Sequence, residues 1–182
     1  PANLPTAVAD ILAGAAISRS FIVDSQGKMG ELQMGSLLLL VASSVSLYAA
    51  GVILNDVFDF KLDQIERPER PIPSGKVSLR SAAIYGAILM LTGILLAFVA
   101  NSLSGLLALL LAGSILLYDA LAKPHGFFGP LNMGVCRGLN LLLGISILGA
   151  LPNWWFAFVP IIYIAAITLI SRGEVHGNNK KH

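Results

Sequence analysis

Six long apolar stretches constrain the fold of this 182-residue chain more than any other feature. A helix needs about 20 mostly apolar residues to cross a membrane, and backbone without internal hydrogen bonds cannot face lipid. The first stretch is the weakest, because Asp10, Ser18 and Arg19 interrupt it. The pattern predicts an all-α, polytopic transmembrane helix bundle that forms a single membrane domain over residues 1–182. Its expected spans are approximately 4–23, 34–54, 79–99, 104–122, 131–151 and 154–171.

The composition supports a membrane location, since 55% of the residues are hydrophobic and 12% are charged. A soluble domain is about 25% charged. The net charge of +2 does not indicate nucleic-acid binding, because the basic residues lie in short segments without interleaved aromatic residues. The single cysteine, Cys136, excludes an internal disulfide and is expected to pack in the core. The sequence starts at Pro1 without a signal-peptide pattern, and an upstream segment stays an open alternative.

The basic residues indicate how the bundle is oriented. If successive spans alternate in direction, segments 55–78 and 123–130 and the tail after Ser171 lie on one side of the membrane. Ten of the twelve Lys and Arg residues fall on that side or at adjacent helix edges: Lys61, Arg67, Arg70, Lys76, Arg80, Lys123, Arg137, Arg172, Lys180 and Lys181. The positive-inside rule assigns this side to the cytoplasm or its topological equivalent, in a bacterial inner membrane or an organelle.

Carboxylates gather where the second span ends, in the stretch from Asn55 to Asp63. Asp56, Asp59 and Asp63 are spaced i, i+3 and i+7, which places them on one face if the helix continues past Asn55. Carboxylates about 4 Å apart repel by roughly 4 kcal/mol, so a dication is a reason to group them. Mg²⁺ takes oxygen ligands from carboxylates, substrate phosphates and water. The alternative is a solvated loop in which the five acidic and five basic residues of 55–80 balance one another.

A proline-rich segment follows the carboxylates. Residues 67–75, Arg-Pro-Glu-Arg-Pro-Ile-Pro-Ser-Gly, contain three prolines, which fix backbone angles and remove hydrogen-bond donors. We expect a stiff, non-helical cap in which Arg67 and Arg70 suit a phosphate pocket.

The combined pattern N-D-x-x-D-x-x-x-D followed by R-P-x-R-P-I-P-S-G resembles the first aspartate-rich motif of the UbiA superfamily of intramembrane prenyltransferases. Further similarities fall in the same order along essentially the whole chain: Pro1-Ala2-Asn3 at the first helix, Tyr118 and Lys123 at the end of helix four, Arg137 and Asn140 in helix five, and residues 171–178 at the second aspartate motif. The sequence of this tail resembles that of UbiA-like proteins of the EboC type.

The resemblance implies a fold of about nine helices, of which the chain holds the first six and stops before the last three. It implies Mg²⁺-dependent transfer of an isoprenoid chain from a prenyl diphosphate to an aromatic or other lipophilic acceptor. By resemblance, Asp56, Asp59, Asp63 and Tyr118 are catalytic, and the metal ligands are Asp56, Asp59, Asp63 and Glu174. Substrate-binding residues would be Asn55, Arg67, Arg70, Lys123, Arg137 and Asn140. Where the family has two aspartates in its second motif, this tail has only Glu174.

Several residues have simpler interpretations. Lys123 could be a positive-inside anchor, Tyr118 an interfacial tyrosine, and Arg137 a snorkelling side chain, although an intramembrane charge indicates function by default. Asp10 could hydrogen-bond within the bundle and has no assigned role. His176 lacks a second spaced ligand, so zinc binding is not expected.

Two other functions compete with the enzyme. A non-catalytic UbiA-like protein would bind an isoprenoid diphosphate or lipid within an assembly. A divalent-cation transporter would need acidic residues midway along several spans, which Asp10 alone does not supply.

Overall fold

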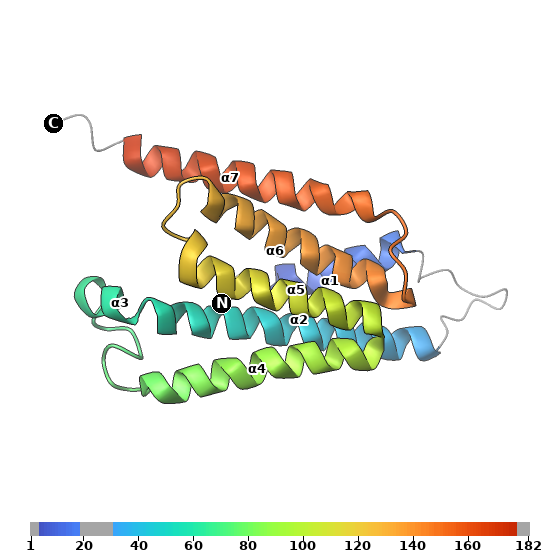
Figure 1. Cartoon of the computed structure of the whole chain (residues 1–182), viewed down its shortest axis with the longest axis horizontal. Helices are drawn as coiled ribbons and strands as arrows, with labels where there is room; N and C mark the ends of the chain where they lie inside the picture. The colour runs from blue at the N-terminus through green and yellow to red at the C-terminus, as the bar shows by residue number, and fades with distance from the viewer. Residues whose placement is uncertain (1–3, 19–30, 178–182) are drawn as a thin grey trace.

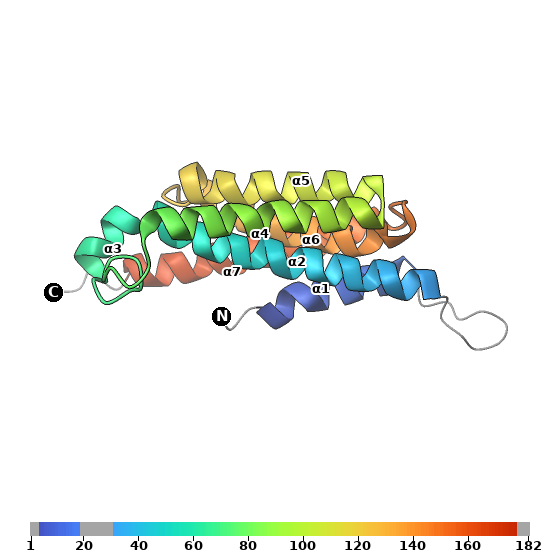
Figure 2. The same ribbon diagram turned by 90° about the horizontal axis from the view of Figure 1, so that it is seen from below.

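Antiparallel helices of very unequal length form the bundle in Figure 1, a computed structural model that describes residues 4–18 and 31–177. The helices are α1 (Leu4–Ile17), α2 (Glu31–Phe58), α3 (Phe60–Glu66), α4 (Leu79–Ala100), α5 (Ser102–Leu117), α6 (Phe128–Ile145) and α7 (Phe158–Gly177). A π-helical turn, η1 (Tyr118–Ala122), extends α5, and the 3₁₀ turns η2 (Ser146–Leu148) and η3 (Trp154–Ala157) flank the α6–α7 connection. Figure 2 shows the same bundle from below.

Five described segments are long and apolar enough to cross a membrane, and α1 is a shorter apolar helix. The five are Met34–Phe58, Leu79–Ala100, Ser102–Ala122, Phe128–Leu148 and Trp154–Ser171. The predicted all-α membrane bundle is therefore confirmed, and the chain is an integral, multi-pass membrane protein. The first span was predicted at residues 4–23. Helix α1 accounts for Leu4–Ile17 of it, and residues 19–23 lie outside the described part of the chain.

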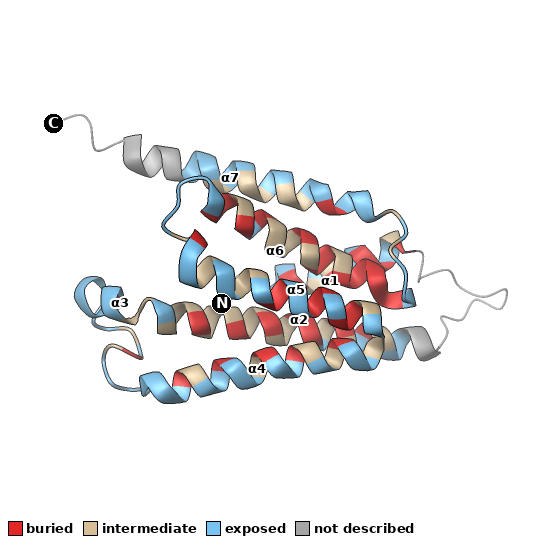
Figure 3. Ribbon diagram, in the orientation of Figure 1, coloured by how far each residue is buried: buried red, intermediate tan, exposed pale blue. Residues whose placement is uncertain are grey.

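The core lies between α1, α2, α4, α5 and α6. Leu40, Leu47 and Leu143 are fully or almost fully buried there, together with small residues such as Ala108. Figure 3 shows this buried interior, while the outer surfaces of α4 and α7 are largely exposed. Exposed leucine, isoleucine and phenylalanine side chains suit helices whose outer faces contact lipid chains.

Glycines allow α6 to approach its neighbours closely. A Cβ added to Gly14 of α1 would lie 2.4 Å from the carbonyl oxygen of Leu141, and one added to Gly144 would lie 2.5 Å from that of Ile11. On another face of α6, a Cβ at Gly134 would lie 2.4 Å from the carbonyl oxygen of Ile161 in α7. Such close packing stabilises the helix contacts by van der Waals attraction, because the hydrophobic effect does not drive helices together in lipid.

The connection from α3 to α4 is non-helical, as its prolines predict. It ends at Ser78, whose hydroxyl accepts a hydrogen bond from the Ser81 backbone N–H at 3.0 Å and caps α4. In Figures 1 and 2, α3 and this connection project from the end of the bundle where α2 ends and α4 begins. The charged residues of 55–78 are thereby placed at one end of the apolar spans.

Candidate functional site

The second helix is interrupted at the carboxylate stretch. Asp59 interrupts the helix between α2 and α3, so the predicted span 34–54 extends to Phe58 and is followed by a second short helix. Backbone i to i−4 hydrogen bonds still link Asp59 to Asn55 at 2.9 Å and Asp63 to Asp59 at 2.8 Å. The helical spacing of the three carboxylates is therefore largely preserved across the interruption.

Arg70 draws two of these carboxylates together. Its Nη1 donates hydrogen bonds to Asp56 Oδ1 at 3.0 Å and to Asp63 Oδ2 at 2.7 Å. Asp63 is only 4% exposed, and its hydrogen bond raises the pKa of Arg70 above the usual value. The proline-rich connection thus returns Arg70 to the end of α2. Arg67 is exposed, and its backbone N–H donates to the Asp63 carbonyl oxygen at 2.9 Å.

The third carboxylate has a different cation. Asp59 forms an ion pair with Lys123, whose Nζ also donates to Asn55 Oδ1 at 3.0 Å. Asn55 Nδ2 in turn donates to Asp59 Oδ2 at 3.3 Å. The predicted residues Asn55, Asp59 and Lys123 therefore meet, although 68 positions separate Asn55 from Lys123.

The π-helical turn η1 explains how Lys123 reaches this place. The Lys123 backbone N–H donates to the Tyr118 carbonyl oxygen at 3.0 Å, an i to i−5 hydrogen bond. Residues five apart share a face in a π-helix, as residues four apart do in an α-helix, so Tyr118 and Lys123 lie one above the other. Single π-helical turns of this kind often occur at functional sites.

A cavity of about 660 Å³ extends from these charges into the bundle. Its polar lining includes Asn55, Asp56, Arg70, Tyr118, Asp119, Arg137 and Asn140, and its apolar lining includes Leu47, Leu111, Ile115, Met133 and Ile164. The cavity therefore has a charged end and apolar walls inside a membrane protein, an arrangement that suits a ligand with a charged head and an apolar chain.

Arg137 and Asn140 form a second polar cluster. Arg137 Nη2 donates to Asp10 Oδ1 at 3.0 Å, and Asn140 Nδ2 donates to Asp10 Oδ2 at 3.1 Å. Ser44 Oγ donates to Asn140 Oδ1 at 2.7 Å. Counting Arg137 at a helix edge was wrong, because it lies at the middle of the Phe128–Leu148 span and pairs with α1 rather than with the membrane surface. The expected hydrogen bonding of Asp10 within the bundle is confirmed.

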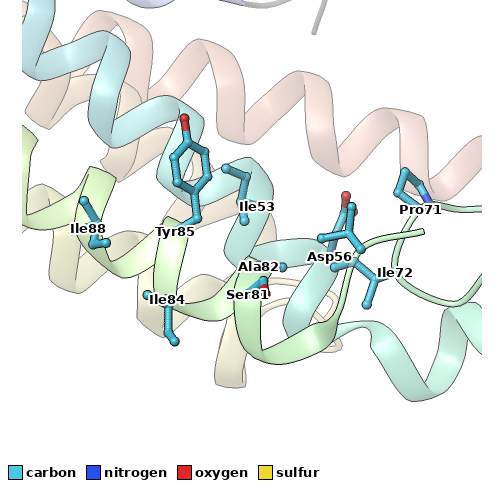
Figure 4. Close-up of a pocket in the computed structure, with 10 residues that line it drawn as sticks. Ile53, Asp56, Pro71, Ile72, Ser81, Ala82, Ile84, Tyr85 and Ile88 are labelled. Atoms are coloured by element: carbon cyan, nitrogen blue, oxygen red, sulfur yellow. The ribbon is translucent and has the colours of Figure 1, made fainter. Parts of the chain in front are cut away.

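A separate groove lies on the outer side of α2 and α4. Figure 4 shows Asp56, Pro71 and Ile72 at one end of it and Ile88 at the other. Its volume is about 620 Å³, and its lining is mostly apolar. Asp56 lines both this groove and the internal cavity.

The donor atoms at the charged end have the chemistry that Mg²⁺ requires. Asp56, Asp59, Asp63 and Asn55 offer carboxylate and amide oxygens, and one or two carboxylates suffice when a substrate phosphate supplies the rest. Among the described residues, no three acidic, His or Cys side chains already converge as a metal cluster. Instead, Arg70 binds Asp56 and Asp63, and Lys123 binds Asp59. The side chain of Glu174 lies outside the described part of the structure.

Sequence reasoning missed Asp119. This residue lies in the membrane-spanning segment Ser102–Ala122 and lines the internal cavity. The rule that an intramembrane charge indicates function was applied to Arg137 and applies equally here.

Several apolar spans around a cavity, with a cluster of paired acidic and basic side chains at its mouth, define an integral membrane protein with a charged site at one end of its helix bundle. The chain belongs to the UbiA prenyltransferase family, which it matches over residues 8–174. The finer resemblance to EboC-type proteins stays a prediction.

Its relatives agree with this assignment. Over 128 residues the chain is 38% identical to digeranylgeranylglyceryl phosphate synthase of Methanococcoides burtonii, covering 70% of this chain and 46% of that protein. A solved structure from a study of digeranylgeranylglyceryl phosphate synthase in membranes is 26% identical, with a TM-score of 0.81 over 98% of this chain and 62% of the other. The structure of a UbiA homolog from Aeropyrum pernix, at 22% identity and a TM-score of 0.70 over 87% of this chain and 58% of the other, shares the fold. The chain spans about half the length of the curated relatives it matches.

Proposed function

We propose that the protein is a membrane-embedded prenyltransferase that transfers an isoprenoid chain from a prenyl diphosphate to a lipophilic acceptor. The observation that carries this proposal is the set of ion pairs Arg70–Asp56, Arg70–Asp63 and Lys123–Asp59 at the mouth of a mainly apolar cavity. Membership of the UbiA family and similarity to digeranylgeranylglyceryl phosphate synthases support it.

The ion pairs suit a diphosphate complex because the basic side chains and the carboxylates can take new partners of opposite charge at the same time. A diphosphate supplies anionic oxygens for Arg70 and Lys123, while the cation that accompanies it supplies positive charge for the carboxylates. A partly buried charge that loses its partner destabilises the protein by several kcal/mol, so simultaneous exchange avoids that cost. The exposed Arg67 is close in sequence and completes the basic set for the diphosphate oxygens.

Asp56, Asp59 and Asp63, assisted by Asn55, would hold Mg²⁺, and Glu174 is proposed as a further ligand from the second motif. When bound, the metal neutralises charge on the leaving diphosphate. The apolar walls of the cavity accommodate the prenyl chain and exclude water, which would otherwise convert an allylic cation to an alcohol. Tyr118 lies on the same helix face as Lys123 and lines the cavity, which supports its proposed role next to the reacting end of the substrate.

The proposed orientation places the diphosphate site on the cytoplasmic side. Segments 55–78 and 123–127 lie at the same end of the bundle, as the alternation of spans predicts (Figure 1). The basic residues there support this side as the cytoplasm or its topological equivalent.

Membranes that contain the protein provide a direct test. With radiolabelled geranylgeranyl diphosphate and Mg²⁺, we expect a labelled lipid product that is absent from membranes without the protein. Asp59→Asn should reduce product formation at least about tenfold, because it removes a charged contact of about 1.5–3 kcal/mol. Glu66→Gln is the matched control, since Glu66 is an exposed acidic residue of the adjoining helix and should leave the rate unchanged.

The same labelled substrate distinguishes the enzyme from the non-catalytic alternative when its binding and its conversion to product are both measured. That alternative is favoured by the second motif, in which this chain has only Glu174 where the family has two aspartates. Mg²⁺-dependent binding of the prenyl diphosphate without any labelled product would support it. An equal rate in wild type and Asp59→Asn would show that the assigned site is wrong.

A further inference from the structure

The outer groove between α2 and α4 is a space that the proposed reaction does not use. Its volume is about 620 Å³, which lies within the range of about 300–1,000 Å³ typical of ligand sites. Ile84, Tyr85 and Ile88 of α4 line it, and each is more than half exposed on the outer side of the bundle. A hollow on this side loses van der Waals contacts unless a chain from the surrounding lipid fills it.

The proline-rich connection closes one end of the groove. Pro71 and Ile72 line this end, and Ile72 is only 9% exposed although it lies in a connection between helices (Figure 4). The Val77 backbone N–H donates to the Pro71 carbonyl oxygen at 3.1 Å, and the Gly75 N–H donates to that of Ile72 at 3.1 Å. Gly75 has a φ of 77°, which glycine adopts without strain. The closed end is therefore fixed in shape before a ligand binds.

Two basic residues flank the closed end. Lys76 directly precedes Val77, and Arg80 directly precedes Ser81, and both Val77 and Ser81 line the groove. Lys76 and Arg80 are exposed, and neither forms an ion pair with another described residue. Arg80 lies one helical turn before Ile84 on the same face of α4. From the first turn of this helix, its long side chain can extend toward the head groups of the bilayer.

The acidic residue in the lining does not oppose an anion at this end. Asp56 Oδ1 accepts a hydrogen bond from Arg70 Nη1 at 3.0 Å, so its charge is compensated, whereas no ion pair compensates Lys76 or Arg80 among the described residues. The hydrophobic effect does not draw a chain from lipid onto an apolar wall, so the head group determines which lipid is preferred. Basic residues at the end of a membrane-spanning helix favour anionic head groups.

We propose that the groove between α2 and α4 binds an anionic phospholipid. One acyl chain lies against Ile84 and Ile88, and the phosphate accepts hydrogen bonds from Arg80 and Lys76. This inference goes beyond the proposed function, because it requires neither a prenyl diphosphate nor its transfer.

Native mass spectrometry of the delipidated protein in detergent measures this preference. The probes are dioleoylphosphatidylglycerol and dioleoylphosphatidylcholine at equal concentration, which share their chains and differ in head-group charge. We expect wild type to retain at least about fivefold more phosphatidylglycerol, because two basic residues attract its head group. The double variant Lys76→Gln with Arg80→Gln should reduce this ratio to less than about twofold.

A single-charge comparison controls for the general loss of positive charge. Arg80→Gln and Lys61→Gln each remove one exposed basic side chain, and Lys61 lies in α3 outside the groove lining. Arg80→Gln should lower the ratio at least about twofold, whereas Lys61→Gln should leave it unchanged. Equal retention of the two lipids by wild type, or the wild-type ratio in the double variant, would overturn the assignment of an anionic head group.

A second pair of variants tests whether the lipid chain lies in the groove. Ile84→Trp places a larger side chain in the groove and should lower retention of phosphatidylglycerol at least about threefold, because the chain loses its contacts there. Leu95→Trp is the matched control, since Leu95 is an exposed residue of α4 outside the groove lining and should leave retention unchanged. Wild-type retention in Ile84→Trp, or an equal loss in Leu95→Trp, would show that the chain does not occupy this groove.

Discussion

Asp10 and Arg137 are tolerated inside the bundle because they pair with each other across helices. Arg137 and Asn140 of α6 both contact the Asp10 carboxylate. This pair joins α1 to α6 at the depth where lipid chains surround the protein. Uncompensated charge there is expensive, so the pair acts as a specific connection between the two helices.

Arg137→Met tests this pair at the level of one residue. The substitution leaves the Asp10 carboxylate half-buried without its cation, and we expect unfolding in mixed micelles to become easier by about 3 kcal/mol. The double variant Asp10→Leu with Arg137→Met should recover much of that stability, because no charge is then left unpaired. Equal stability of wild type and Arg137→Met would contradict the importance assigned to the pair.

The residue assignments show what sequence reasoning reaches at this scale. Asn55, Asp59 and Lys123 were predicted to serve one site, and the fold brings them into contact. Which cation meets which carboxylate was not predictable, because it depends on how the proline-rich connection returns Arg70 to α2. Asp119 was overlooked, because hydropathy smooths over a single acid next to an apolar run.

At the scale of elements, hydropathy predicted the spans well because membrane thickness fixes helix length. It could not predict the interruption at Asp59 or the π-helical turn at Tyr118–Ala122, since both are changes of backbone hydrogen bonding within continuous helical sequence. These two irregular elements nevertheless place most of the candidate site. The site therefore depends on two backbone features that the pattern of apolar residues does not predict.

Close helix packing gives a prediction for the α1–α6 contact. Gly144→Ala puts a Cβ 2.5 Å from the Ile11 carbonyl oxygen, so the helices must separate and stability should fall by about 1–3 kcal/mol. Gly113→Ala is the matched control, because nothing lies within 4 Å of its added Cβ and alanine favours the helix. Thermal unfolding in detergent measures both variants, and equal melting temperatures would contradict the close contact.

The whole molecule is a membrane bundle whose charged site lies at one end. Orientation can be tested with single-cysteine variants in which Cys136 is replaced by alanine. In the Lys76→Cys variant, the cysteine should react with a membrane-impermeant maleimide only in inside-out vesicles. In the variant Ala150→Cys, at an exposed position, it should react only in right-side-out vesicles. The reverse pattern of labelling would contradict a cytoplasmic diphosphate site.

Mg²⁺-dependent binding of a prenyl diphosphate is the claim on which the whole account depends. The most direct measurement is the dissociation constant of geranylgeranyl diphosphate for the purified protein in nanodiscs, with Mg²⁺ and with Mg²⁺ removed by EDTA. We predict that removing Mg²⁺ weakens binding at least about tenfold in wild type, since one charged contact alone supplies about 1.5–3 kcal/mol. A double Asp56→Asn and Asp59→Asn variant should show little Mg²⁺ dependence. Equal affinity with and without Mg²⁺, or an unchanged Mg²⁺ effect in that variant, would contradict the account.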